Sequence, residues 1–267
     1  MNGSATPCRL CGSETDPLFE LLVLGRHTAR YRQCRTCGLT QTQEPDWLDE
    51  AYATPIHPTD TGLLARNIRL CAVVSSFLHL SGVRDELVLD EAGGYGVLTR
   101  LLRDSGFHAY LRDPYASNLF APGFEWRDDL GPPVAVTAFE VLEHFVHPRK
   151  EFDRLAARGA EFIITSTEVH PGERPAADWP YLSPSSGQHV AFYRTDTLRR
   201  LGGLCGYPVV IAGPFLQIFA RRPFPAWRWH AAVRLARLIH PMVQKLRGSL
   251  TVPDCEALRR RLDASRT

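Results

Sequence analysis

Four of the seven cysteines lie in two close pairs near the start of the chain. Cys8 and Cys11 form one C-x-x-C pair, and Cys34 and Cys37 form the other. Two thiolates at this spacing can bind the same tetrahedral ion, and two such pairs are typical of structural zinc sites. Because four thiolates leave no open position on the ion, the pattern predicts a structural Zn²⁺ held by these four cysteines, not a catalytic metal.

A glycine-rich turn predicts a nucleotide-binding loop. The run 86–90 reads as a short apolar strand, the run 97–105 reads as a helix, and the turn between them is rich in glycine. Glycines let the backbone approach a ligand closely, and the first amides of a helix attract polar groups. The next expected strand ends at Asp113, whose carboxylate can accept hydrogen bonds from both hydroxyls of a ribose.

The glycine spacing argues against a dinucleotide cofactor. The dinucleotide fingerprint is G-x-G-x-x-G. Counted from Gly93, the third glycine is replaced by Leu98, and counted from Gly94 it is replaced by Thr99. The loop therefore fits a smaller nucleotide-like cofactor better.

The elements that position these residues alternate between strands and helices. Alternation of this kind predicts an α/β fold with a doubly wound, mostly parallel, seven-stranded Rossmann-like sheet whose last strand is antiparallel. The expected strands are 86–90, 107–112, a weak one near 123–126, 134–139, 161–165, 208–212 and 215–220. Helices are expected at 46–80, 97–105, 148–157 and 195–204, and 168–193 reads as a loop.

Four stretches, in the expected order across roughly residues 86–220, resemble class I S-adenosylmethionine-dependent methyltransferases. LDEAGGYGVLTRLL resembles the first motif of that family, YLRDPYA its ribose-binding strand end, VTAFEVLEHFVHP its motif after the fourth strand, and GQHVAFYRTDTLRRLGGLCGY its late histidine-bearing segment. Ala92 replaces the first glycine of the loop, so we expect a turn that is not left-handed there. The resemblance implies S-adenosylmethionine as cofactor. The candidate cofactor-binding residues are Glu91, Ala92, Gly93, Gly94, Gly96, Asp113, Pro114, Phe139 and Glu140.

The cysteine segments CRLCGS and YRQCRTCGLT resemble the N-terminal zinc module of methyltransferases that act on nucleotide-linked sugars. Those sugar C-methyltransferases usually have a further C-terminal domain, which the residues after 222 are too few to form. The resemblance implies a small-molecule or sugar-type acceptor.

Two histidines are the candidate catalytic groups. Methyl transfer requires alignment of the acceptor, and often removal of one proton. His189 lies in a segment that can cover the pocket, and His144 follows the fourth strand; the resemblance implies His189 as the base, with His144 assisting. The candidate substrate-binding residues are Tyr52, Glu143, Tyr181 and Gln188.

The 267 residues divide by composition into four segments. We expect a separate zinc-binding module (1–45) with too few apolar residues for a core, a helical connection (46–85), the methyltransferase domain (86–222) and a basic amphipathic helical extension (223–267). No apolar stretch appears long enough to span a bilayer, and no signal pattern is visible, so we expect a cytoplasmic protein without a membrane partner.

The alternatives from other classes are a zinc-ribbon nucleic-acid-binding protein and a nucleic-acid methyltransferase. Four arginines near the cysteines favour them: Arg26, Arg30, Arg32 and Arg35. Neighbouring acids largely offset this charge, and the whole chain has a net charge of only +2. We therefore expect no nucleic-acid partner.

Overall fold

The computed structural model describes residues 6–53, 60–170 and 172–264, and it divides the chain into two compact units. Unit 1 comprises Met1–His57 and Ala138–Pro223, and unit 2 comprises Pro58–Thr137 and Phe224–Thr267. Strand β6 (Ala135–Phe139) begins in unit 2 and ends in unit 1. Residues 54–59, part of the expected connection 46–85, lie outside the described residues.

The larger sheet is mixed, with the strand order β5-β4-β6-β7-β10-β9. β4 pairs in parallel with β5 and β6, whereas β10 is antiparallel to both β7 and β9. The bounds are β4 (Leu87–Glu91), β5 (His108–Arg112), β7 (Phe162–Ser166), β9 (Val209–Ala212) and β10 (Leu216–Ala220).

The expected seventh strand is wrong for the described residues, where this sheet has six strands. Near 123–126 only a single bridge forms, between Leu111 and Glu125. Pro122 has no amide hydrogen for a ladder, and Gly123 turns the chain with a φ of +87°. The segment therefore touches the sheet edge without extending it.

Among the described residues of unit 2 lie four α-helices and one short 3₁₀ helix, η1 (Asp128–Leu130). The helices are α2 (Leu63–Leu80), α3 (Val97–Asp104), α6 (Ala226–Arg247) and α7 (Thr251–Ala264). α2 contacts both α6 and α3. The ring of Phe77 on α2 meets Trp229 of α6 edge to face at 5.5 Å.

Helix α2 is long and apolar enough to cross a membrane by length and composition, which the sequence analysis did not expect. A core helix passes the same test, and the C-terminal half of α2 is buried, from Leu70 to Leu78 except Ala72. Packing against α3 and α6 accounts for the apolar residues of this buried half.

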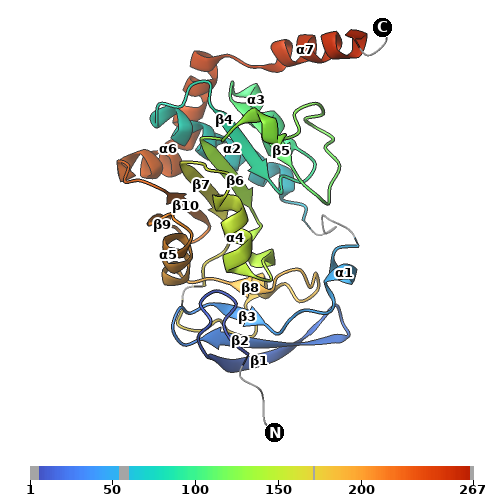
Figure 1. The fold of residues 1–267 in the computed structure, drawn as a ribbon, viewed down its shortest axis with the longest axis vertical. Helices are drawn as coiled ribbons and strands as arrows, with labels where there is room; N and C mark the ends of the chain where they lie inside the picture. Colours follow the sequence, from blue (N-terminus) through green and yellow to red (C-terminus); the bar gives the residue numbers. More distant parts are fainter. Residues whose placement is uncertain (1–5, 54–59, 171, 265–267) are drawn as a thin grey trace. The chain divides into compact units, whose positions relative to one another are not determined.

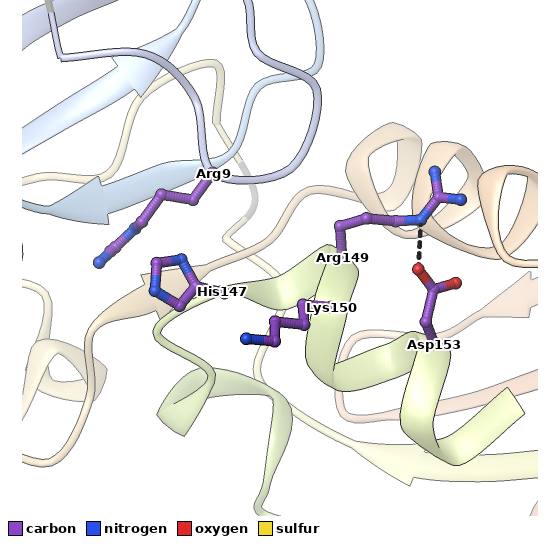
Figure 2. Close-up of a pocket in the computed structure, with 5 residues that line it drawn as sticks. All are labelled: Arg9, His147, Arg149, Lys150 and Asp153. Carbon is purple, nitrogen blue, oxygen red and sulfur yellow. Dashed lines mark hydrogen bonds and ion pairs between the residues drawn. The ribbon is translucent and has the colours of Figure 1, made fainter. Parts of the chain in front are cut away.

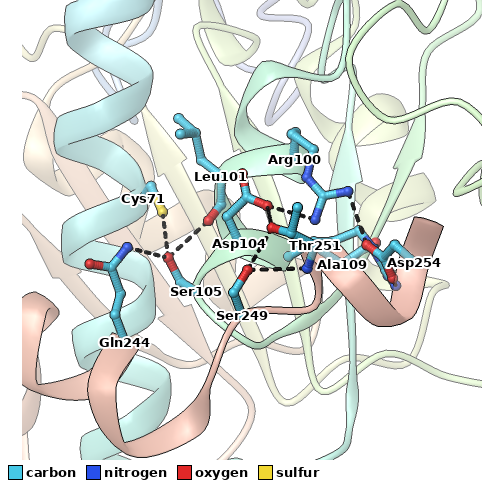
Figure 3. Close-up of polar contacts among 11 residues, drawn as sticks. Cys71, Arg100, Leu101, Asp104, Ser105, Ala109, Gln244, Ser249, Thr251 and Asp254 are labelled. Carbon is cyan, nitrogen blue, oxygen red and sulfur yellow. Dashed lines mark hydrogen bonds and ion pairs between the residues drawn. The ribbon is translucent and has the colours of Figure 1, made fainter. Parts of the chain in front are cut away.

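A buried ion-pair network joins α7 to α3 within unit 2. Asp254 of α7 receives hydrogen bonds from Arg103 Nε at 2.8 Å and Nη2 at 2.5 Å, and Arg100 Nη1 lies 2.9 Å away. Beside it, Thr251 Oγ1 donates to Asp104 at 2.7 Å (Figure 3). These contacts attach the C-terminal extension to helix α3.

In unit 1 the N-terminal residues form a four-stranded antiparallel sheet in the order β1-β2-β3-β8 (Figure 1). The strands are β1 (Thr15–Val23), β2 (His27–Cys34), β3 (Thr40–Thr42) and β8 (Ala191–Phe192). This sheet shares a core with a distant segment: Tyr31 and Trp47 pack with Leu182, Val190 and Phe192.

The expectation that residues 1–45 lack a core and stand apart is therefore wrong. Their apolar residues are too few alone, but strand β8 supplies both a pairing edge and apolar side chains. The remaining elements of unit 1 are α1 (Leu48–Ala51), η2 (Leu142–His144), α4 (Pro148–Ala156), η3 (Pro180–Leu182) and α5 (Thr195–Leu204). The expected helices at 148–157 and 195–204 are confirmed, and the expected loop 168–193 contains η3 and β8.

Candidate functional site

The glycine-rich turn follows β4 and opens α3 in unit 2, and Asp113 braces it. The amide of Gly94 donates to Asp113 Oδ2 at 2.8 Å. Asp113 Oδ1 accepts from the amides of Tyr115 and Ala116, each at 2.8 Å. An ionised carboxylate offers about four acceptor positions, so Asp113 can brace both turns and still accept from a ligand.

The turn is left-handed at Ala92, contrary to expectation. Ala92 has a φ of +54°, which brings its Cβ close to the backbone and favours glycine. Gly93 and Gly96 leave no space for a side chain. An added Cβ would lie 2.4 Å from Asp90 Oδ2 at Gly93 and 2.5 Å from Asn118 Oδ1 at Gly96. The loop thus has glycine where a side chain would clash, and it has backbone strain at Ala92.

Asp90 braces the same loop and was missed by the sequence analysis. It is buried, with Oδ1 accepting from Thr137 Oγ1 at 2.8 Å and Oδ2 from Thr99 Oγ1 at 3.0 Å. Burial raises the pKa of Asp90 to about 6, although both hydroxyls oppose the rise. The acid in the strand end LDE was visible in the sequence, but its two threonine partners lie on other elements.

The other candidate cofactor residues are divided between the units. In unit 2, Glu91 forms an ion pair with Arg112, and Pro114 is exposed in the turn after β5. Phe139 and Glu140 belong to unit 1, at the end of β6. Glu140 is also left-handed, with a φ of +54°, and its amide donates to Ser166 Oγ at 2.8 Å.

The structure brings the candidate catalytic and acceptor residues of unit 1 together. One ring nitrogen each of His144 and His189 and one carboxylate oxygen of Glu143 lie within 4.8 Å of one another. The two imidazole rings meet edge to face, with centroids 5.1 Å apart. Tyr181 O–H donates to Glu143 Oε1 at 2.6 Å, and Tyr52 Oη lies 2.9 Å from His144 Nδ1.

Backbone carbonyls orient both imidazoles. His189 Nδ1 donates to the Tyr181 carbonyl at 2.6 Å, and His144 Nδ1 donates to the Gln188 carbonyl at 3.1 Å. A carbonyl only accepts, so each bond places the ring proton on Nδ1 and leaves a lone pair on Nε2. Both rings therefore have a nitrogen able to take a proton or bind an ion.

The environment distinguishes the two histidines as bases. Burial, and then the neighbouring His189, lower the pKa of His144 to about 3. His144 therefore stays neutral near pH 7 and accepts a proton poorly. This lowered pKa argues against His144 as the base.

Two further residues hold the cluster in place. Gln188 is buried, and its Nε2 donates to the Ala51 carbonyl at 2.8 Å, so its side chain fastens α1 to the histidine segment. Tyr193, also buried, donates to the Leu142 carbonyl at 2.7 Å and supports the turn that carries His144. The role of Tyr193 depends on a contact across the fold, which no sequence motif marks.

The four N-terminal cysteines converge as the sequence predicts. All four Sγ atoms lie within 4.8 Å of one another, and the Sγ distances are 3.5 Å for Cys8 to Cys37 and 3.5 Å for Cys11 to Cys34. Tetrahedral coordination at a Zn–S distance of about 2.3 Å places sulfurs about 3.8 Å apart. The amide of Cys37 also lies 3.4 Å from Cys34 Sγ, an arrangement that stabilises a thiolate. The donor set fits zinc.

A hollow of about 460 Å³ lies beside Arg9, the residue that follows Cys8. Arg9 lines it together with His147, Arg149, Lys150 and Asp153 (Figure 2). Arg149 Nε donates to Asp153 at 2.9 Å. Arg9 lies 3.7 Å from Glu44, so acids offset much of the positive charge. We assign this hollow no ligand.

A family model described as "Methyltransferase domain" matches residues 64–210, more than half of the chain. The chain belongs to this family, which places it among the class I S-adenosylmethionine-dependent methyltransferases. The matched residues include both the glycine-rich loop and the histidine cluster. No curated protein matches the chain.

Several solved structures are similar to the chain at a distance. Magnesium protoporphyrin IX methyltransferase (ChlM) from Synechocystis PCC 6803 is 16% identical with a TM-score of 0.42, over 65% of this chain and 91% of that one. An O-methyltransferase family protein from Burkholderia thailandensis is 19% identical with a TM-score of 0.45, over 67% and 68% of the two chains. The mitomycin 7-O-methyltransferase MmcR is 16% identical with a TM-score of 0.47, over 68% and 62%. These likenesses are too distant to bear on the acceptor.

Proposed function

We propose that the protein transfers the methyl group of S-adenosylmethionine to a small-molecule or sugar-type acceptor, with a histidine removing the acceptor's proton. The observation that carries the cofactor assignment is the hydrogen bond from the Gly94 amide to Asp113, which joins the two ligand-facing turns of the family's fold. The observation that supports the base is the oriented Nε2 lone pair of His189.

Cofactor binding can be measured without knowing the acceptor. Titration calorimetry with S-adenosylhomocysteine should detect binding to the wild-type protein. Asp113→Asn should weaken it roughly 10- to 100-fold, because hydrogen bonds to charged groups contribute about 1.5–3 kcal/mol. Asp129→Asn, an exposed acid of the same unit, is the matched control and should bind normally. Absence of wild-type binding at millimolar ligand would refute the cofactor assignment.

The base is tested by separating turnover from cofactor affinity. His189→Ala should lower methyl transfer about 10²- to 10⁴-fold, the usual contribution of a general base. Its affinity for S-adenosylhomocysteine should stay close to wild type, because the base serves the acceptor. His27→Ala, which removes a histidine paired with Glu50 in the same unit, is the control. Loss of cofactor affinity in a folded His189→Ala protein would assign His189 to the cofactor.

A second candidate for this cluster is a divalent cation that lowers the pKa of an acceptor hydroxyl. One observation favours it: Glu143 is fully buried, yet its Oε2 has no hydrogen-bond partner among the described residues. Two neutral imidazoles and a carboxylate are a recurrent ligand set for divalent metals. An ion there would occupy the nitrogen that the base would use, so the two candidates exclude each other.

Metal analysis distinguishes these candidates. If the cluster holds an ion, the wild-type protein should contain about two equivalents of metal, and Glu143→Gln should contain one. If His189 is the base, both proteins should contain only the equivalent bound by cysteines.

We further propose that the four cysteines hold structural Zn²⁺ and that the protein acts in the cytoplasm, where thiols stay reduced. The nucleic-acid alternative gains little from the N-terminal arginines. Arg35 pairs with Asp16 and Glu14, and Arg26 pairs with Glu50. Salt-dependent binding of RNA or DNA would revive it.

A further inference from the structure

Helix α6 of unit 2 presents a continuous apolar stripe to solvent. Trp229, Ala232, Ala236 and Val243 form its buried face. Six large apolar side chains are nevertheless exposed on it, among them Leu238 at 74%: Trp227, Val233, Leu235, Leu238, Met242 and Leu246. At about 100° per residue all of these positions except Val233 fall within an arc of about 100°, so five of them form one stripe.

The same helix is strongly basic. Between Asp196 and Asp254 the sequence contains no aspartate or glutamate at all. Three cations on α6 are exposed as the apolar stripe is: Arg234, Arg237 and Lys245. Arg228 lies next to the ring of Trp227 and adds a fourth cation. A helix with a tryptophan-bearing apolar stripe and a polar face that is basic and free of acids is typical of helices that lie in a membrane interface.

We propose that α6 docks the protein on an anionic lipid surface, with its axis in the plane of the membrane. Anionic headgroups would pair with the cations while the apolar stripe enters the boundary between headgroups and acyl chains. The expectation of no membrane partner rested on the lack of a long apolar stretch, and an interfacial helix does not need one.

Charge complementarity selects this partner over two others. A second copy docking through the same face would place cations of one helix against those of its symmetry mate, which is unfavourable. A nucleic acid would satisfy the cations, but its phosphates offer no surface for Leu238 and Met242. A lipid interface accommodates both the cations and the apolar stripe.

The test is flotation of the full-length protein with vesicles. Wild-type protein should bind vesicles of phosphatidylcholine containing phosphatidylglycerol, bind pure phosphatidylcholine weakly, and dissociate partly at high salt. Leu238→Ser with Met242→Ser should reduce binding at least about tenfold, given the area that these side chains bury. Arg234→Gln with Arg237→Gln should reduce binding only to the anionic vesicles.

Leu22→Ser, at an exposed leucine of unit 1, is the matched control and should bind as wild type does. Circular dichroism checks that every variant is folded. Failure of wild-type protein to bind anionic vesicles overturns the proposal, as does unchanged binding by the Leu238 and Met242 double variant. A self-association in the ultracentrifuge that Leu238→Ser abolishes would instead assign the stripe to a second copy, and RNA binding lost in the arginine variant would assign it to nucleic acid.

Discussion

At the scale of single residues, Ala92 shows where the cofactor loop stores strain. Its left-handed backbone costs an L-residue roughly 1–2 kcal/mol that glycine avoids, although glycine loses more entropy on folding. We expect Ala92→Gly to raise the free energy of unfolding by about 1 kcal/mol, measured by urea denaturation. Ala157→Gly is the control: Ala157 has an ordinary φ of −63°, so that substitution should destabilise. A destabilised Ala92→Gly protein would show that Ala92 is not strained.

Asp90 makes stability depend on pH. Its pKa rises from 3.8 to about 6 on folding, so between these values the folded protein holds more protons than the unfolded chain. Stability must therefore fall as pH rises through this window, by up to about 3 kcal/mol, and then stay level. Asp90→Asn should lose this dependence, which urea denaturation at pH 4.5 and pH 7 would measure. The exposed Asp129→Asn control should keep it, and an unchanged slope in Asp90→Asn would contradict the assignment.

At the scale of elements, α7 depends on one buried carboxylate. Burial alone would raise the pKa of Asp254, but the ion pairs with Arg103 and Arg100 outweigh burial and lower it. Removing one partner of a buried ion pair leaves the other charge buried and uncompensated. Asp254→Ala should therefore destabilise the protein by about 3–5 kcal/mol in chemical denaturation. Asp263→Ala, an exposed acid on the same helix, should have little effect. Equal effects of the two substitutions would show that the pair contributes nothing.

The sequence predicted those elements whose signal is local. The strand 86–90, the helices 148–157 and 195–204 and the cysteine set follow from periodicity and spacing. The proximity of His144 and His189 could also be predicted. His144 follows β6 and His189 lies in the segment after β7, and both strands end at the same edge of the sheet. The φ of Ala92 could not be predicted, since residue type does not fix the conformation of a turn. The ion pair between Arg103 and Asp254 could not be predicted either, because the two residues are far apart in the sequence.

At the scale of the whole molecule, the N-terminal sheet is the clearest limit of sequence analysis. From their composition, residues 1–45 are expected to need a zinc ion for stability, because their apolar residues are few. Their fourth strand is β8, far along the chain, and the shared core includes Leu182 and Phe192. No local sequence pattern predicts that such distant segments pair. For the same reason, the two units of the chain do not match the segment boundaries at 45, 85 and 222 that composition predicts.

This shared core sets what zinc removal should do. Structural zinc contributes roughly 10–16 kcal/mol to the folding of small zinc peptides, comparable with the whole stability of a domain. Chelation or Cys34→Ser should therefore expose β1–β3 together with residues 179–192, and not residues 1–45 alone. Hydrogen exchange read by mass spectrometry should show both segments losing protection while β4 and β5 of unit 2 keep theirs. The exposed Cys255→Ser control should lose neither metal nor protection. Loss confined to residues 1–45 would show that the N-terminal module folds independently of β8, and full metal content in Cys34→Ser would remove Cys34 from the ligand set.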